Sequence, residues 1–290
     1  MDDKVKMTKT LFTRRRFLAA AGAIAVMGSG LGGYTWLIEP GWMEVVRHDL
    51  PVKGLPAGLD GRILAQISDL HIGAQVSSDF IIRSLATLAS LKPDLLVITG
   101  DVMTCHAGEQ LQEVERVMRH CPIPPLGAYV GLGNHDYGRD FQNSTVADAL
   151  SELLRGLGMA VLRNERKAVE GLQVVGLDDL WAPHFGPQSV LAEIGPDTPA
   201  IVLSHNPDAA DLPVWAGYRG WILSGHTHGG QCKPPFLPPP LLPVDNRRYT
   251  AGAYDLFDGR HMYINRGLGH LTPVRINARP ELTLHRLMRV

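Results

Sequence analysis

Cysteine is scarce in this chain of 290 residues, which contains only Cys105, Cys121 and Cys232. Three widely spaced thiols cannot form a disulfide framework, and an odd number leaves at least one of them unpaired. None stands in a Cys-x-x-Cys pair. Cys105 and its neighbour His106 lie close to a Gly100-Asp101 motif described below. The sequence leaves open whether they belong to a site or whether Cys105 is a buried, inert thiol.

An excess of charge of one sign is also missing, since 28 basic and 29 acidic residues give a formal net charge of −1. The first 38 residues hold six Lys or Arg and two Asp, which leaves 22 basic and 27 acidic residues in the rest of the chain. A mildly acidic body is atypical of proteins that follow the phosphates of nucleic acids. We therefore expect no stable nucleic-acid partner.

Internal repeats and a linker between two folded domains are absent from the sequence as well. The composition, with 45% hydrophobic and 20% charged residues, is that of an ordinary globular protein. We predict one α/β domain over residues 41–290, preceded by a separate segment of residues 1–40.

The N-terminal segment is typical of a targeting signal. Basic residues lead into Arg14-Arg15-Arg16-Phe17-Leu18, and residues 17–38 form an uncharged run rich in Ala and Gly. This order resembles a twin-arginine signal, which implies export by the twin-arginine machinery to a periplasmic or other extracytoplasmic location. The 22 residues of the run are enough to cross a bilayer, and no clear cleavage site follows it. A cleaved signal and an uncleaved anchor in the cytoplasmic membrane both remain open.

In the first half of the body, short apolar runs typical of buried strands each stop at polar residues. The runs at 63–67, 95–99 and 127–132 end at Asp69-Leu70-His71, Gly100-Asp101 and Gly133-Asn134-His135-Asp136. Apolar residues at helical spacing predict helices over 81–89, 111–118 and 147–157. Such alternation predicts parallel strands, whose carboxyl ends lie at one edge of a sheet.

The second half of the chain has similar polar strand ends but few helices. Strands are expected at 172–177, 200–203 and 221–223, ending at Asp178-Asp179, Ser204-His205 and Gly225-His226-Thr227-His228. We therefore predict a layered fold with a more antiparallel second sheet, closed by strands at 261–264 and 282–285.

Six prolines between Pro234 and Pro243 alternate with Phe and Leu, which excludes a helix or a central strand there. One interpretation is a rigid loop packed on the domain. The other is an apolar lip near the site that contacts lipid or an acyl chain.

Seven strand-end residues have side chains that bind metal ions. They are Asp69, His71, Asp101, Asn134, His205, His226 and His228. Each alone has an ordinary explanation, such as a turn or a satisfied polar group, but their common position at strand ends predicts a shared site. Carboxylate, amide oxygen and imidazole together suit Mn, Fe, Zn or Ni better than Ca.

The motifs Asp-x-His, Gly-Asp, Gly-Asn-His-Asp, a His after a strand, and Gly-His-x-His resemble the calcineurin-like metallophosphoesterase superfamily in order and spacing. The resemblance runs from about residue 63 to the C-terminus. Gly-His-Thr-His-Gly-Gly-Gln, Ser-His-Asn-Pro-Asp and Asn-Arg-Gly-Leu-Gly resemble its exported bacterial phosphodiesterases, the YaeI-like and YkuE-like branch, related to the UDP-2,3-diacylglucosamine hydrolases. This resemblance implies an α-β-β-α fold, in which two mixed sheets form a sandwich flanked by helices.

The resemblance also implies two divalent ions and a division of their ligands. One ion would be held by Asp69, His71 and His228, the other by Asn134, His205 and His226, with Asp101 bridging both. Two cations so placed activate a bridging water for attack on phosphorus.

By the same resemblance His135 lies near the leaving-group oxygen as general acid, and we expect Asp136 to orient its imidazole. Asp178 and Arg266 are weaker candidates for contacts with substrate, because a turn and a structural ion pair explain them equally well.

These inferences indicate a metal-dependent phosphoric ester hydrolase. The leading hypothesis is a phosphodiesterase acting on a lipid-linked or nucleotide-sugar pyrophosphate, in contact with the membrane. A phosphomonoesterase or a cyclic-nucleotide phosphodiesterase uses the same core. A non-catalytic metal-binding envelope protein is the alternative from another class, and the intact ligand set together with His135 argues against it.

Overall fold

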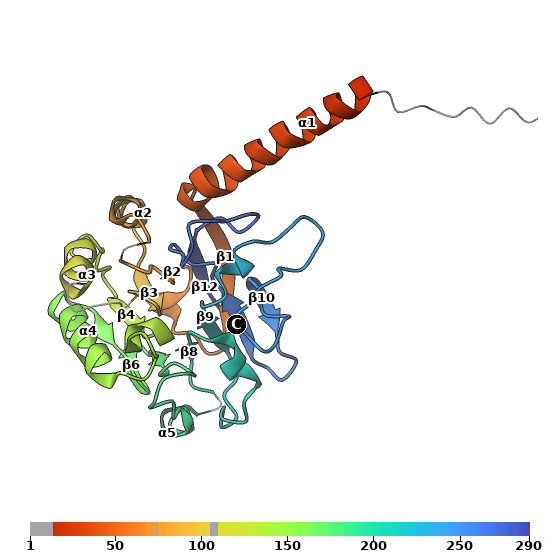
Figure 1. Ribbon diagram of the computed structural model, residues 1–290. Coiled ribbons are helices and arrows are strands. Elements are labelled where there is room, and N and C mark those ends of the chain that lie inside the picture. The colour runs from red at the N-terminus through yellow and green to blue at the C-terminus, as the bar shows by residue number, and fades with distance from the viewer. Residues whose placement is uncertain (1–13, 74, 105–109, 196) are drawn as a thin grey trace, which may run out of the picture.

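The computed structural model describes residues 14–73, 75–104, 110–195 and 197–290. A long helix, α1 (Arg14–Gly33), projects from a rounded body that contains all the strands (Figure 1). A π-helical turn (Tyr34–Ile38) and a 3₁₀ turn (Glu39–Gly41) join this helix to the first strand. Cys105 and His106 lie outside the described residues, so the two interpretations of this pair stay as predicted.

The first of two six-stranded sheets holds the N-terminal strands and the last strand of the chain. In spatial order its strands are β1 (Glu44–Val52), β12 (Glu281–Arg289), β2 (Ile63–Ile67), β3 (Leu95–Thr99), β4 (Ala128–Gly131) and β5 (Ala160–Val161). β12 pairs antiparallel with β2, and all other neighbours are parallel. The first residue of β1 therefore lies at the edge where β2, β3 and β4 end.

The second sheet is parallel at its centre and antiparallel only at its two edges. In spatial order its strands are β10 (Gly252–Asp255), β11 (His261–Ile264), β9 (Trp221–Ser224), β8 (Ala200–Leu203), β7 (Leu172–Gly176) and β6 (Glu165–Val169). The prediction of a more antiparallel sheet is thus wrong for its central strands. Short turns and the helix α5 (Gln188–Ala192) suffice to connect these parallel strands. The scarcity of helices therefore did not indicate antiparallel pairing.

The prediction that residues 282–285 close the second sheet is wrong. They belong to β12, whose backbone pairs with β1 and β2 in the first sheet. An isolated apolar run carries no information about its partner strand, because pairing over more than 200 residues is set by the packing of the whole domain.

Three apolar layers hold the sheets and helices together. Helices α2 (Ser78–Ser90), α3 (Gln110–Met118) and α4 (Ser144–Gly156) cover the outer face of the first sheet, and α5 packs on the second (Figure 1). In β3, Leu96 and Ile98 face the helices while Leu95 and Val97 face the other sheet. Alternate side chains of one strand thus enter two layers, as the pleat requires. The predicted α-β-β-α architecture is confirmed.

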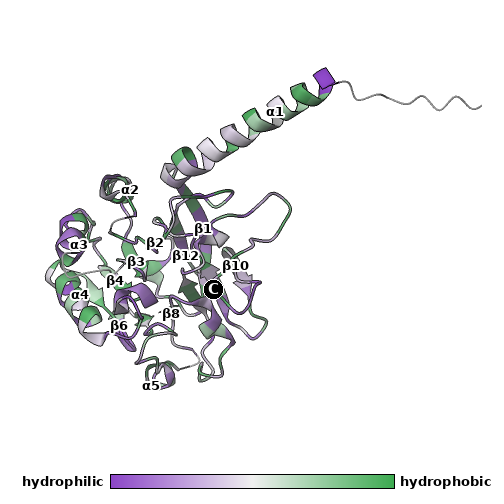
Figure 2. Cartoon of the chain, viewed as in Figure 1, coloured by the Kyte–Doolittle hydropathy of each residue, from purple (hydrophilic) through white to green (hydrophobic). Residues whose placement is uncertain are grey.

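Helix α1 differs from the other helices because its apolar side chains are exposed. Phe17, Val26 and Met27 are all more than half exposed, and Figure 2 shows apolar residues along the helix behind a polar N-terminal end. By length and composition, residues 14–41 can cross a membrane.

Candidate metal centre

The seven predicted metal ligands meet at one edge of the sandwich, and all seven are buried. Residues after β2, β3 and β4 reach this edge from the first sheet, and residues after β8 and β9 reach it from the second. Backbone hydrogen bonds tie the loops together, with the Asp69 amide donating to the Gly100 carbonyl at 2.9 Å and the His71 amide to the Asp101 carbonyl at 3.0 Å. The structure therefore brings together what the sequence placed separately.

Six of these residues form two groups of potential ligand atoms, and two of the six, His71 and Asp101, form a third group with His135. Asp69, His71 and His228 make one group and Asp101, His205 and His226 make the other. Within each group the ligand atoms lie within 4.8 Å of one another. One Asp101 carboxylate oxygen is 3.2 Å from His205 Nε2 and 3.6 Å from His71 Nε2, so this carboxylate stands between the two groups.

Each of the four imidazoles is held by one ring nitrogen against an oxygen atom. The contacts join His71 Nδ1 to Thr104 Oγ1 (2.7 Å), His205 Nδ1 to the Thr99 carbonyl (2.7 Å), His226 Nε2 to the Pro243 carbonyl (2.8 Å) and His228 Nδ1 to the Gly269 carbonyl (3.3 Å). A carbonyl can only accept, so in three of the rings this nitrogen carries the proton and the other presents a lone pair. This is how metal-binding histidines are oriented in proteins.

The free ring nitrogens converge on each other. His71 Nε2 lies 3.1 Å from His228 Nε2, and His205 Nε2 lies 3.3 Å from His226 Nδ1. Lone pairs at these distances repel unless a proton or a cation lies between them. Burial lowers the pKa of His71 and His228 well below the ordinary value, and burial together with the neighbouring His205 lowers that of His226 to about 4. Burial thus favours the neutral form of His71, His226 and His228, and the facing ring nitrogens can share a proton or bind a cation.

Two further observations agree with a cation. At His205, burial opposes the charged form, but the Asp101 carboxylate outweighs it and raises the pKa well above the ordinary value. A positive charge is therefore favoured beside Asp101. Among the described residues, the buried Asn134 Oδ1 has no hydrogen-bond partner, which leaves an oxygen acceptor available at the same edge. The residues present thus suit divalent ions with nitrogen and oxygen ligands.

The loops that carry these side chains have an unusual backbone. Five of the seven residues have positive φ: Asp69 (50°), His71 (47°), Asp101 (53°), His226 (70°) and His228 (52°). Such conformations are uncommon for residues other than glycine and cluster at functional sites. Gly225 has no room for a side chain, because a Cβ atom there would lie 1.9 Å from Ser68 Oγ.

His135 lies beside the buried cluster and is itself only partly buried. Its amide donates to Asp101 Oδ1 at 2.9 Å, and its ring centroid is 5.0 Å from that of His71. The expected contact with Asp136 is not found in the described part of the chain. Asp136 instead accepts hydrogen bonds from the amides of Gly133 (2.9 Å) and Met103 (3.1 Å).

Asp136 therefore binds the loop that carries His135 through two backbone amides, and its role in orienting the imidazole stays a prediction. The 3₁₀ turn of residues Asn134–Tyr137 directs this carboxylate back toward the backbone. Burial, with a contribution from Asp101, raises the pKa of Asp136 to about 8.

An aromatic pair at the site was missed by the sequence reasoning, and the buried Asp179 was only a weak candidate as part of the Asp178-Asp179 pair. The ring of Trp181 lies 4.7 Å from that of His226 and stacks on Phe141 at 5.9 Å, and Phe141 lies 5.0 Å from His135. Asp179 accepts from the Trp181 amide at 2.8 Å, and burial raises its pKa to about 6. The Asp178-Asp179 pair after a strand could have pointed to this carboxylate, whereas the rings lie in loops without periodicity.

Asp178 and Arg266 have structural partners. For Asp178 these are the Tyr137 hydroxyl and Arg163 Nε (3.3 Å), and for Arg266 they are Glu44 (2.8 Å) and Glu281 (2.5 Å). The ion pairs of Arg266 correspond to the structural alternative given above. A contact of either residue with substrate stays a prediction.

A cavity of about 380 Å³ opens beside His228. Its apolar lining includes Pro240, Leu241, Leu242, Pro243 and Leu271. In the proline-rich loop Pro239 is buried, as a loop packed on the domain requires, while Phe236 and Leu241 are exposed. Contact of the loop with lipid or an acyl chain stays a prediction.

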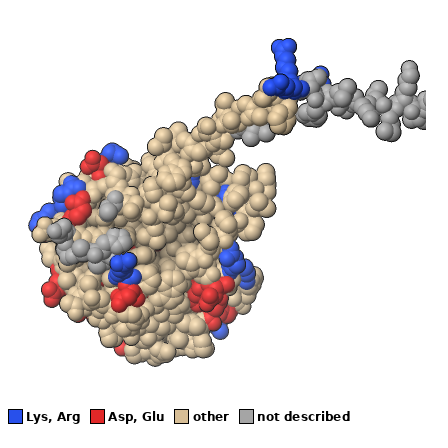
Figure 3. All heavy atoms as spheres, in the orientation of Figure 1, with Lys and Arg blue, Asp and Glu red and all other residues tan. Residues whose placement is uncertain are grey.

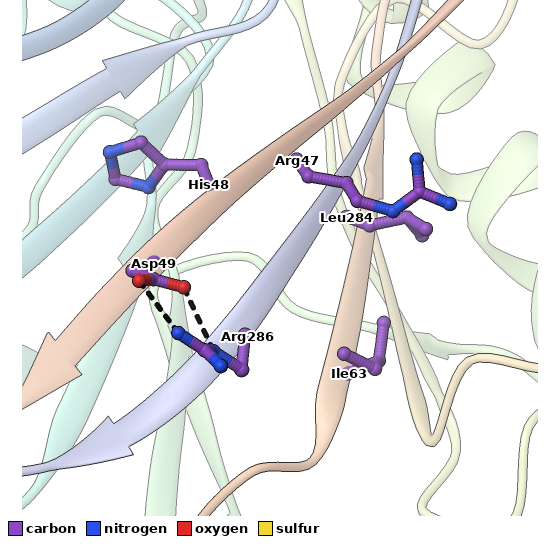
Figure 4. A pocket seen from close by; sticks show the side chains of 6 residues that line it. All are labelled: Arg47, His48, Asp49, Ile63, Leu284 and Arg286. Atoms are coloured by element: carbon purple, nitrogen blue, oxygen red, sulfur yellow. Dashed lines mark hydrogen bonds and ion pairs between the residues drawn. The ribbon is translucent and has the colours of Figure 1, made fainter.

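A larger cavity of about 540 Å³ lies on the first sheet and contains none of the seven strand-end residues. It is lined by Arg47, His48, Asp49, Ile63, Leu284 and Arg286. Figure 4 shows Arg286 turned toward Asp49, with which it forms an ion pair of 2.8 Å. The charged groups of this cavity thus partly satisfy one another.

Comparison with known proteins agrees with this geometry. The family model for calcineurin-like phosphoesterases matches residues 63–230, which include all seven strand-end residues. The chain is similar to the phosphodiesterase YaeI of Escherichia coli (strain K12), with 32% identity over 286 residues that cover 96% of this chain and 100% of YaeI. It is 31% identical to the uncharacterized metallophosphoesterase YkuE of Bacillus subtilis (strain 168), over 97% of this chain and 98% of YkuE.

A third relative is the UDP-2,3-diacylglucosamine pyrophosphatase LpxG of Chlamydia trachomatis, 28% identical over 88% of this chain and 93% of LpxG. The match to the family model covers more than half of the chain, and YaeI aligns over nearly its whole length. The chain therefore belongs to the calcineurin-like phosphoesterases, a family of hydrolases that use divalent metal ions.

Proposed function

We propose that the protein is a two-metal phosphodiesterase. In this proposal one ion is held by Asp69, His71 and His228, the other by Asn134, His205 and His226, and Asp101 is shared. The observation that carries it is the orientation of the four imidazoles, each bound through one nitrogen to an oxygen atom and presenting the other to the cluster. This arrangement brings ring nitrogens of two histidine pairs within 3.1 and 3.3 Å of each other, where a cation can replace a shared proton.

The bound ions would supply a nucleophile from water near neutral pH and neutralise the phosphoryl oxygens. The Asp101 carboxylate, between the two ligand groups, reduces the repulsion between the positive charges. His135 is partly exposed beside the buried set, where its imidazole can donate a proton to the leaving-group oxygen. Asp136 holds the His135 loop through two backbone amides.

A phosphodiester with an apolar part is the substrate class that we propose. Two relatives are named as a phosphodiesterase and as a pyrophosphatase of a diacylated nucleotide sugar. The apolar cavity beside His228 supports the same class, because pockets for such ligands combine apolar walls with a few polar groups.

Export and membrane retention form the second part of the proposal. Arg14 and Arg15 are the first residues of α1, a helix that is long and apolar enough to span a bilayer. We expect the intact chain in the membrane fraction, with its N-terminal mass unchanged, and the Arg14→Lys/Arg15→Lys variant in the cytoplasm. A shortened chain in the soluble fraction would show that the segment is a cleaved signal.

The activity is tested by hydrolysis of bis(p-nitrophenyl) phosphate and p-nitrophenyl phosphate with added Mn²⁺, together with metal analysis. We expect two ions per chain and faster hydrolysis of the diester. Faster hydrolysis of the monoester would make the protein a phosphomonoesterase. Bound metal without hydrolysis of either ester would favour the non-catalytic metal-binding protein.

A further inference from the structure

Among the exposed large apolar side chains, two sets that are far apart in the sequence stand near the candidate site. One is the junction after α1, and the other is the proline-rich loop of residues 234–243. Seven residues, here called the apolar rim, are more than half exposed: Trp36, Leu37, Ile38, Trp42, Phe236, Leu237 and Leu241. Exposed apolar residues are common singly, but a group of this size marks an interaction surface.

The two parts of the apolar rim are joined by one segment of chain. The amide of Arg275 donates to the Thr35 carbonyl at 3.0 Å, at the base of α1. One residue further, the Ile276 carbonyl accepts from the amide of Lys233 at 2.9 Å, at the start of the loop. Figure 1 shows α1 and the loop at the same end of the body. The rim is therefore one surface.

The apolar rim borders the candidate metal centre. β1 begins at the edge where β2, β3 and β4 end, so α1 joins the body at the edge that carries the predicted ligands. The far end of the proline-rich loop is bound to the site itself, since His226 Nε2 donates to the Pro243 carbonyl at 2.8 Å. The cavity beside His228 opens among residues of this loop.

A lipid bilayer is the partner that this surface fits. Residues 14–41 form a continuous candidate span, and the rim begins within its C-terminal part. Trp36 and Trp42 lie where aromatic rings are enriched, at the end of a span. The rim contains no acidic residue, the guanidinium of Arg279 lies 4.1 Å above the Trp42 ring, and Lys233 is exposed. On the face drawn in Figure 3, acidic groups lie away from the base of α1.

We propose that the apolar rim lies in the membrane–water interface when α1 spans the bilayer, so that the cavity beside His228 opens toward lipid. The docking rests on the proposed membrane anchorage. The docking would let a lipid phosphodiester enter the cavity from the bilayer without transfer through water. This consequence rests on the proposed phosphodiesterase activity. Two experiments separate these two claims.

The first experiment measures the depth of a fluorescent label in the full chain, reconstituted in phosphatidylethanolamine and phosphatidylglycerol vesicles. A nitrobenzoxadiazole group is attached at Leu237→Cys, in a background with the three natural cysteines replaced. The matched control is Phe257→Cys, which is 82% exposed in the turn between β10 and β11, at the opposite edge of the second sheet. We expect lipids with shallow spin labels to quench the label at 237 and not at 257. Equal and weak quenching at both positions would contradict docking of the rim on the membrane. A protein partner on this surface would give the same result.

The second experiment needs no cysteine replacement and compares two substrates. Phe236→Ser/Leu237→Ser should hydrolyse water-soluble bis(p-nitrophenyl) phosphate at the natural rate. Hydrolysis of a diacylglyceryl p-nitrophenyl phosphate in the same vesicles should fall about tenfold or more, since two apolar side chains no longer enter the interface. Phe257→Ser should change neither rate. An unchanged vesicle rate would contradict the proposed route of the substrate. Absence of all hydrolysis in the natural chain would contradict the proposed function, and the quenching result would still decide the docking.

Discussion

Two groups of histidines in this protein show what makes a metal site. One group is the buried edge cluster of His71, His205, His226 and His228. The other is the interior pair, the partly buried His48 and the buried His285, which lies between the sheets against the rings of Trp221 and Tyr263. Burial lowers the pKa of His48, and it lowers that of His285 to about 3. Burial thus favours the neutral form of this pair, as it does for His71, His226 and His228 at the edge, whereas Asp101 raises the pKa of His205.

The two groups differ in what their ring nitrogens meet. At the edge, carboxylate oxygens of Asp69 and Asp101 lie 3.2–3.6 Å from imidazole nitrogens, and ring nitrogens of neighbouring histidines face each other. In the interior, neither imidazole forms an ion pair within the described residues, and His285 is bound to the Gln66 side chain at 2.9 Å. Strand ends from two sheets are needed to bring carboxylates and imidazoles together, whereas mid-strand histidines pack as aromatic residues.

The largest expected difference between the two groups concerns metal content. Asp101→Ala should lose both ions and nearly all phosphodiesterase activity, because its carboxylate stands between the two ligand groups. Metal analysis and hydrolysis of bis(p-nitrophenyl) phosphate measure both effects. His285→Phe is the control and should keep both ions and the natural rate. If the Asp101→Ala variant still contained two metal ions per chain, the edge carboxylate would not be what distinguishes the metal-binding group from the interior pair.

The edge cluster should itself divide into two halves. His228→Ala and His226→Ala are each expected to lose about one ion per chain, since the two residues belong to different ligand groups. The remaining ion should differ in affinity between the two variants, which titration with a competing chelator measures. Equal loss of both ions from each variant would contradict the division.

His135 should separate metal binding from turnover. His135→Ala is expected to keep both ions, while kcat falls by about 10²–10⁴-fold if the imidazole is the general acid. The matched control is His184→Ala, since this exposed histidine is bonded to Ser144 and lies outside the cluster. An unchanged kcat in His135→Ala would exclude the role as general acid.

The difference between the two groups also explains which features of the structure can be predicted from the sequence. Strand-end motifs are local, so the positions of Asp69, Asp101 and His205 could be predicted from apolar runs followed by polar residues. The pairing of β12 with β1 and β2 could not, because it joins residues more than 200 positions apart. The direction of the Asp136 carboxylate was also inaccessible, since it depends on the turn formed by its own loop.

The interior pair should be visible in stability and not in catalysis. The pKa of His285 is about 3 in the folded protein and has an ordinary value of 6.5. Between these two values the unfolded chain binds a proton that the folded chain does not, so the free energy of unfolding should decrease as the pH falls from 6.5 toward 3. The slope from one such group is at most about 1.4 kcal/mol per pH unit. His285→Phe removes this group, and its unfolding free energy should therefore decrease less steeply than that of the natural chain over this range. Denaturant unfolding of both proteins, with a chelator present, measures the difference in slope. The contribution of the edge histidines cancels in this comparison because both proteins contain them. Identical slopes would mean that the His285 imidazole is protonated in the folded state as readily as in the unfolded chain. Burial would then not lower its pKa.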